Sequence, residues 1–222
     1  MTRELTSDRR GADKGRARSV VVFVHGYGAD GADLLGLADP LGQHLPDTAF
    51  YAPDAPDPSV ANPMGRQWFP IPWLDGSSES AAAEGLAAAA ADLDAFLDGV
   101  LAEEGLGADR LVLFGFSQGA MMSLQVAPRR AAPVAGIVAC SGRLVAPERL
   151  ATEAVSKPPV LLMHGDRDDV VPFASMQEAG QTLTGAGFPT YAFVMEGTGH
   201  GIAPDALGQA LGFVRQVLGD EG

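Results

Sequence analysis

Six short runs of apolar residues, rich in β-branched side chains, alternate with helix-compatible stretches along the chain, and this alternation limits the fold to few possibilities. The apolar runs cover residues 19–24, 48–52, 110–114, 134–139, 159–163 and 190–195. The helical stretches cover residues 33–45, 80–104, 118–127, 173–183 and 206–218. Nearly continuous apolar character is typical of strands that are covered on both faces. We therefore predict an α/β fold with a mostly parallel central sheet and helices on both of its faces.

The expected domain organisation follows from charge and composition. The first 18 residues hold six basic and three acidic side chains and no apolar run of the kind found in a secretory signal. We expect a disordered charged tail there. No polar or Gly/Ser-rich linker divides the remainder, so residues 19–222 are predicted to form a single domain.

The net negative charge of the chain limits the kinds of partner that it is expected to bind. The formal net charge is −13, and all of the excess acid lies beyond residue 18. Such a surface disfavours nucleic acid and anionic membranes and favours an uncharged or cationic small molecule. No apolar run approaches the roughly 20 residues of a membrane span, so no stable membrane association is expected. Cys140 is the only cysteine, which excludes an intrachain disulfide and fits a reducing, cytoplasmic location.

A predicted strand runs directly into the sequence Gly-Phe-Ser-Gln-Gly, centred on Ser117, and a predicted helix follows it. A G-x-S-x-G turn in this context places the serine hydroxyl above the sheet edge, because Gly115 and Gly119 let the strand and the helix approach closely. A serine needs an imidazole to remove its proton and a carboxylate to orient that imidazole. Ser117 is therefore the predicted nucleophile.

The two partners of the serine are expected from later loops at strand ends. The loop after the fifth apolar run holds three carboxylates, Asp166, Asp168 and Asp169, and spacing alone does not choose among them. The loop after the sixth run holds His200 between two glycines. His200 is the predicted general base, because the order Ser, Asp, His along the chain is that of α/β-hydrolases.

These motifs resemble those of the small carboxylesterase, phospholipase and acyl-protein thioesterase family of the α/β-hydrolase superfamily. The resemblance spans about residues 20–217, with His-Gly-Tyr-Gly at 25–28, Gly-Phe-Ser-Gln-Gly at 115–119, His-Gly-Asp-x-Asp-x-Val-Val-Pro at 164–172 and Gly-His-Gly at 199–201. It implies the α/β-hydrolase fold, here without a large lid. It also implies that the second aspartate of the third motif, Asp168, is the catalytic acid.

Two N–H donors are needed to stabilise the oxyanion of an acyl-transfer transition state. One is expected from Gln118, directly after the nucleophile and at the positive end of the following helix. The other is expected in the glycine-rich loop after the first strand, where the resemblance assigns it to the backbone N–H of Tyr27. Family members often hold leucine at that position. Because the backbone acts, the difference bears on specificity and not on mechanism.

A proline-rich segment, residues 53–72, has too many prolines for a regular element and carries Met64, Trp68 and Phe69. Long loops of this kind usually have a function. The segment resembles the tryptophan-containing loop that borders the acyl site in the family, which makes these three residues candidate walls of a substrate pocket. The alternative is that the aromatic residues only pin the loop to the core.

The sequence thus predicts a serine carboxylesterase that hydrolyses short- to medium-chain acyl esters through an acyl-enzyme intermediate. Acyl-protein thioesterase or lysophospholipase activity is the alternative within the same chemistry, and a non-catalytic ligand-binding protein on the same fold is a more distant one. The expected partner is a small ester or thioester, and a homodimer is included among the expected assemblies. No cofactor is expected, and no metal, because the chain lacks H-E-x-x-H and other clustered His and carboxylate motifs.

Overall fold

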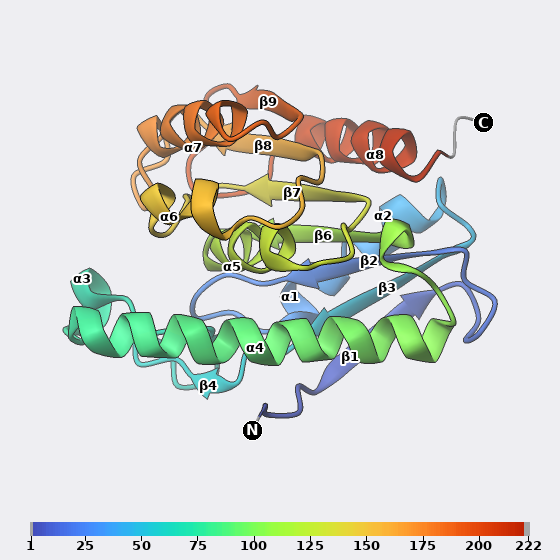
Figure 1. Cartoon of the computed structure of the whole chain (residues 1–222), viewed down its shortest axis with the longest axis horizontal. Helices are drawn as coiled ribbons and strands as arrows, with labels where there is room; N and C mark the ends of the chain where they lie inside the picture. Colours follow the sequence, from blue (N-terminus) through green and yellow to red (C-terminus); the bar gives the residue numbers. More distant parts are fainter. Residues whose placement is uncertain (1, 220–222) are drawn as a thin grey trace.

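The computed structural model describes residues 2–219, and its main feature is a seven-stranded sheet in the spatial order β1-β3-β2-β6-β7-β8-β9 (Figure 1). The strands are β1 Ser7–Gly11, β2 Ser19–Val24, β3 Thr48–Pro53, β6 Leu111–Phe116, β7 Gly136–Cys140, β8 Val160–Gly165 and β9 Thr190–Met195. Every neighbouring pair in this sheet is parallel except β1 and β3. A separate ribbon pairs β4 Asp57–Pro58 with β5 Arg66–Gln67.

Helices cover both faces of the sheet. One face carries α4 Glu79–Glu104, α5 Gln118–Val126, α6 Pro147–Glu153 and α7 Ala174–Gly185, while the other carries α1 Gly31–Leu35, α2 Ala38–Gly42 and α8 Pro204–Leu218. Side chains of β2 alternate between the two cores, with Val22 on the α4 side and Phe23 on the α8 side. Because both faces are covered, the parallel strands are apolar on both sides. The predicted layered α/β architecture is confirmed.

The remaining helical segments are short. They are α3 Pro72–Asp75 and two 3₁₀ turns, Ala108–Arg110 and Ala127–Arg129. Neither α3 nor α6 was expected from the sequence, because each is too short to show helical periodicity. Among residues 2–219, no helix is both long enough and apolar enough to cross a membrane.

The single helix predicted over residues 33–45 is divided into α1 and α2. Pro40 explains the division, because its ring lacks an N–H and would clash with the carbonyl four residues earlier in a continuous helix. In α2 it is the third residue, within the first turn, where a backbone N–H has no helical acceptor to lose. The other predicted helices agree with the structure to within a few residues at each end.

The expectation of a disordered tail over residues 1–18 is wrong for the part that the structure describes. Residues 7–11 form β1, which pairs antiparallel with β3 from Ser7 opposite Pro53 to Gly11 opposite Ala49. The side chain of Arg3 pairs with a carboxylate of α4, Asp92. Several of the charges that suggested a solvated tail therefore make ion pairs, two of them with buried carboxylates of α4, and charged side chains on an edge strand also oppose pairing with another chain. The single domain stays a prediction.

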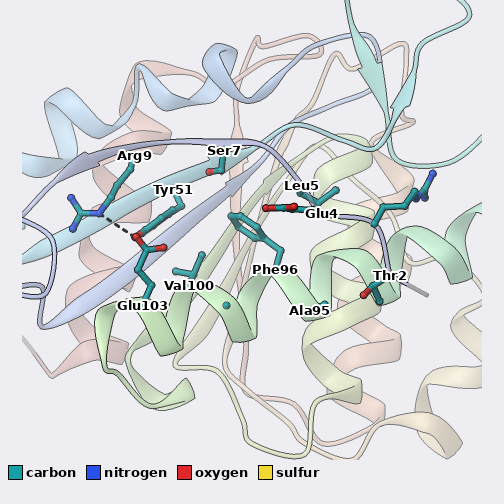
Figure 2. A pocket seen from close by; sticks show the side chains of 12 residues that line it. Thr2, Glu4, Leu5, Ser7, Arg9, Tyr51, Ala95, Phe96, Val100 and Glu103 are labelled. Carbon is teal, nitrogen blue, oxygen red and sulfur yellow. Dashed lines mark hydrogen bonds between the residues drawn. The ribbon is translucent and has the colours of Figure 1, made fainter.

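A buried polar network anchors this N-terminal strand. Residues 2–5, 7 and 9 line a groove of about 540 Å³ against α4, and Figure 2 shows Arg9 beside Tyr51 at one end of it. The guanidinium of Arg9 lies 2.8 Å from Glu104, and the Tyr51 hydroxyl donates to the same carboxylate at 2.6 Å. The Glu104 side chain is fully buried. These contacts tie β1, β3 and the end of α4 together.

Replacing Glu104 by glutamine is expected to lower the free energy of unfolding by about 2 kcal/mol, because it leaves a mostly buried guanidinium without its carboxylate. Urea unfolding at neutral pH would measure the change. The matched control is Glu103→Gln, which removes only an exposed pair with Lys14 and is expected to cost less than about 0.5 kcal/mol. Equal losses for the two variants would contradict a structural role for the network.

Candidate active site

Ser117 occupies a sharp turn between β6 and α5. Its backbone lies at φ 53° and ψ −116°, a strained conformation for a non-glycine residue, and its N–H donates to the Cys140 carbonyl at 2.8 Å. The flanking glycines are required by close packing. A Cβ on Gly119 would lie 1.8 Å from the Val24 carbonyl oxygen, and one on Gly115 would lie 2.3 Å from the Gly119 carbonyl oxygen. The turn therefore has the form that the G-x-S-x-G pattern predicts.

His200 lies in the loop after β9 and reaches the serine across β7 and β8. Its Nε2 is 2.9 Å from Ser117 Oγ, and its Nδ1 is 2.7 Å from Asp168 Oδ2. A carboxylate only accepts hydrogen bonds, so Nδ1 carries the proton and Nε2 is left to accept the serine hydroxyl. The structure brings the three predicted residues together at the edge of the sheet where β6, β8 and β9 end.

Asp168 is held by contacts on both of its oxygens. While Oδ2 faces His200, Oδ1 accepts from the backbone N–H groups of Val170 at 3.0 Å and Val171 at 2.9 Å. Burial acts to raise the pKa of this carboxyl, but the hydrogen bonds from His200 and from the two N–H groups outweigh it, and the pKa lies below its ordinary value. Asp168 is therefore ionised at neutral pH.

The other two candidate carboxylates are placed differently. Asp166 is exposed, and its Oδ1 accepts from the Gly197 N–H at 2.7 Å, which braces the loop after β8 against the loop after β9. Asp169 is exposed. Of the three carboxylates, only Asp168 makes a hydrogen bond with His200 among the residues described.

Two further histidines are buried near the site in structural roles. His25 contacts the Gly26 carbonyl through Nδ1 at 2.8 Å and accepts the Ala55 N–H through Nε2 at 3.0 Å, and burial lowers its pKa. His164 donates from Nε2 to the Val171 carbonyl at 2.9 Å, and the same nitrogen is 3.3 Å from Asp168 Oδ2. His164 thus supports the loop that carries Asp168.

The predicted oxyanion donors lie on the segments that flank the nucleophile. Gln118 is the first residue of α5, so its N–H has no helical acceptor. Tyr27 follows Gly26, where an added Cβ would lie 3.3 Å from the Ser117 Cβ, so the loop after β2 passes directly beside the serine. Their roles in holding an oxyanion stay predictions.

The side chain of Gln118 makes contacts that the sequence did not reveal. Its Oε1 accepts the Trp68 backbone N–H at 2.9 Å, and its Nε2 donates to the Phe69 carbonyl at 2.7 Å. The Trp68 indole also donates to the His25 carbonyl at 3.0 Å and is fully buried. These bonds fix the proline-rich segment onto the nucleophile turn. No local pattern could have indicated them, because they join residues about fifty positions apart.

The three candidate pocket residues therefore differ in how exposed they are and in what surrounds them. Trp68 presents no exposed surface, which favours the alternative that this residue only holds the loop against the core. Phe69 lines a cavity of about 240 Å³ beside α5. Met64 is 90% exposed at the tip of the segment. A role for Phe69 and Met64 in substrate binding stays a prediction.

Changing Gln118 to methionine is expected to destabilise the fold by about 2 kcal/mol or more, because it leaves a buried N–H and a buried carbonyl of the proline-rich segment without hydrogen-bond partners. Urea unfolding would give the free energy. Gln125→Met, farther along the same helix, is the matched control and should change it by less than about 0.5 kcal/mol. If both variants unfold at the same urea concentration, the two hydrogen bonds of the Gln118 side chain do not stabilise the fold.

Cys140 is buried at this edge of the sheet, where β7 ends. Burial raises the pKa of the Cys140 thiol to about 12, so it is a packed thiol and not a thiolate nucleophile at neutral pH. Across residues 2–219, no group of three or more His, Cys, Asp or Glu side chains is arranged to hold a metal ion.

Over most of its length the chain is similar to proteins named as esterases and acyl-protein thioesterases. The model of the phospholipase/carboxylesterase family matches residues 11–218. Acyl-protein thioesterase 1 of Gibberella zeae is 28% identical over 217 residues, covering 90% of this chain and 91% of that protein. Esterase YpfH of Escherichia coli is 25% identical over 205 residues, covering 91% and 84%. The crystal structure of esterase PE8 is 43% identical and superposes with a TM-score of 0.91, covering 96% of this chain and 99% of that one. This chain therefore belongs to the phospholipase/carboxylesterase family of α/β-hydrolases.

Proposed function

We propose that the chain is a serine carboxylesterase that hydrolyses short- to medium-chain acyl esters through an acyl-enzyme intermediate. The observation that carries the proposal is the continuous pair of hydrogen bonds from Asp168 through His200 to the hydroxyl of Ser117. Membership of the family supports an ester-hydrolysing activity.

In the proposed mechanism, Ser117 Oγ attacks the ester carbonyl while His200 Nε2 takes the hydroxyl proton. The negative charge that develops on the carbonyl oxygen is held by the N–H groups of Tyr27 and Gln118. His200 then gives the proton to the departing alcohol, which leaves an acyl group on Ser117. Water attacks this acyl-enzyme with His200 again as the base, and the acid product and free serine are released. Asp168 stays ionised and stabilises the charged imidazole throughout.

Thioester cleavage is the second candidate, because several similar proteins carry the name acyl-protein thioesterase 1. The same attack applies, with a thiol in place of the alcohol as leaving group. The two activities separate experimentally. A p-nitrophenyl ester series of increasing acyl length, run beside acyl thioesters of the same lengths, compares kcat/KM for each class. We expect the esters of short and medium length to be preferred, and a preference for long-chain thioesters would replace this proposal with the second.

A fluorophosphonate tests the proposed function directly, because it reacts only with an activated serine. One equivalent is expected to bind covalently per chain and to abolish ester hydrolysis. A protein that binds acyl ligands but neither reacts with the probe nor turns over any ester would contradict the proposal and indicate a non-catalytic member of the fold.

A further inference from the structure

A small cavity of about 240 Å³ lies between the segment after β7, the start of α4 and the proline-rich segment. Most of its wall is apolar, with Phe69, Ile71, Trp73 and Leu86 among the lining residues. The volume is below the roughly 300–1,000 Å³ of pockets for drug-sized ligands, so the cavity suits a short chain. Among the polar side chains that line it is Arg143.

The segment that carries Arg143 begins against the nucleophile. A Cβ on Gly142 would lie 3.0 Å from the Ser117 carbonyl oxygen, so the residue before Arg143 touches the nucleophile's own backbone. Ser141 and Ala146, at the two ends of the segment, have φ values of 50° and 52°. Within residues 2–219, Ser117 is the only other non-glycine residue with positive φ. Such strain persists only where surrounding structure holds it, and it clusters at functional sites.

The guanidinium of Arg143 is oriented but not neutralised. It stacks over the Trp73 ring, 4.4 Å from the ring centroid, and its enclosed Nε has no acceptor within the described part of the chain. No carboxylate lies within ion-pair distance of Arg143 in residues 2–219, although the chain has 28 acidic and 15 basic residues. Arg149, on the same cavity, differs because it pairs with Glu153.

We propose that Arg143 binds a carboxylate at the far end of the acyl chain, so that half-esters of short dicarboxylic acids are preferred substrates. The inference rests on the proposed esterase function. A planar guanidinium matches a carboxylate with two parallel hydrogen bonds, and the apolar wall accommodates the intervening methylene groups. Phe69 in that wall belongs to the loop expected to border the acyl site, and for this reason the proposal assigns the carboxylate to the acid side of the ester.

The charged residues around the cavity favour a ligand that carries a single negative charge. Glu79 also lines it and is exposed, so a doubly charged phosphate would meet this carboxylate, and among the lining residues that the structure describes Arg143 is the arginine without a carboxylate partner. The net acidity of the chain predicts uncharged or cationic substrates. That argument concerns the field at long range, which salt screens beyond about 8–10 Å, whereas Arg143 acts by contact.

A matched pair of substrates tests the inference. Monoethyl adipate ends in a carboxylate, and the ethyl ester of adipic monoamide has the same length and shape without the charge. Acid release in a pH-stat gives kcat/KM for each. The wild-type ratio of carboxylate to amide is expected to be about 10 or more, since a charge-assisted bidentate bond is lost with the amide. In Arg143→Gln the ratio should fall to about 1, mainly through KM, and Arg143→Lys should give an intermediate ratio.

Arg149→Gln is the matched control and should keep the wild-type ratio, because that guanidinium is already paired. A wild-type ratio near one, or an Arg143→Gln variant with an unchanged ratio, would overturn the inference. Faster turnover of the phosphonate analogue of the adipate ester would also overturn it, because it would indicate a dianion site. If p-nitrophenyl butyrate is hydrolysed while the ratio is one, only this inference fails. If no ester is turned over, the proposed function fails with it.

Discussion

Ser117→Ala is expected to lower kcat for ester hydrolysis by about 10³-fold or more and to abolish covalent labelling by a fluorophosphonate. The loss should be this large because the change removes the hydroxyl that hydrogen-bonds to His200, and water must then attack the ester without an acyl-enzyme. KM should change much less, since the N–H groups of Tyr27 and Gln118 are retained. Stopped assays on p-nitrophenyl butyrate and mass spectrometry of the labelled protein measure the two effects.

Ser123→Ala is the control for that change. Ser123 is likewise a buried serine, but it lies within α5, and in the described part of the chain its hydroxyl donates to the Gly119 carbonyl. It should keep activity and labelling. Labelling of Ser117→Ala at one equivalent per chain would refute the assignment of the nucleophile.

Asp168→Asn should reduce kcat at neutral pH by about 10³- to 10⁴-fold. The physical reason lies in how this side chain is held. Oδ1 accepts two backbone N–H groups, so the one oxygen of asparagine is expected to turn toward them and to present its NH₂ group to His200. A donor facing Nδ1 removes the proton from that nitrogen and places it on Nε2, which then has no lone pair for the Ser117 hydroxyl.

The neighbouring aspartate supplies the comparison for this variant. Asp169→Asn makes the same chemical change one residue later, at an exposed side chain, and is expected to change kcat less than about threefold. Asp166→Asn should weaken the loop contact with Gly197, and its loss of kcat should lie between those of the other two variants. If Asp169→Asn proves as damaging as Asp168→Asn, the assignment of the acid is wrong.

The sequence predicted the six parallel strands because their apolar runs are local and bounded by turn residues. It missed β1, whose charged residues show no apolar pattern and whose position depends on a partner about forty residues away in β3. The sequence pattern also predicted one helix where the structure has α1 and α2. The apolar spacing continues through both helices, although Pro40 lies between residues 33 and 45. Periodicity measures which face is buried, and it does not report where backbone hydrogen bonds are interrupted.

At the site, the sequence by itself was enough to predict the nucleophile and the base. The Ser117 turn is a local motif flanked by its own strand and helix, and chain order left only His200 as the expected base. Spacing alone could not separate Asp168 from Asp166 and Asp169. The tertiary structure separates them, because β8 and β9 end side by side and only one of the three side chains points at the imidazole. It alone also revealed the hydrogen bonds from the Gln118 side chain to the proline-rich segment and, within residues 2–219, the lack of a carboxylate partner for Arg143.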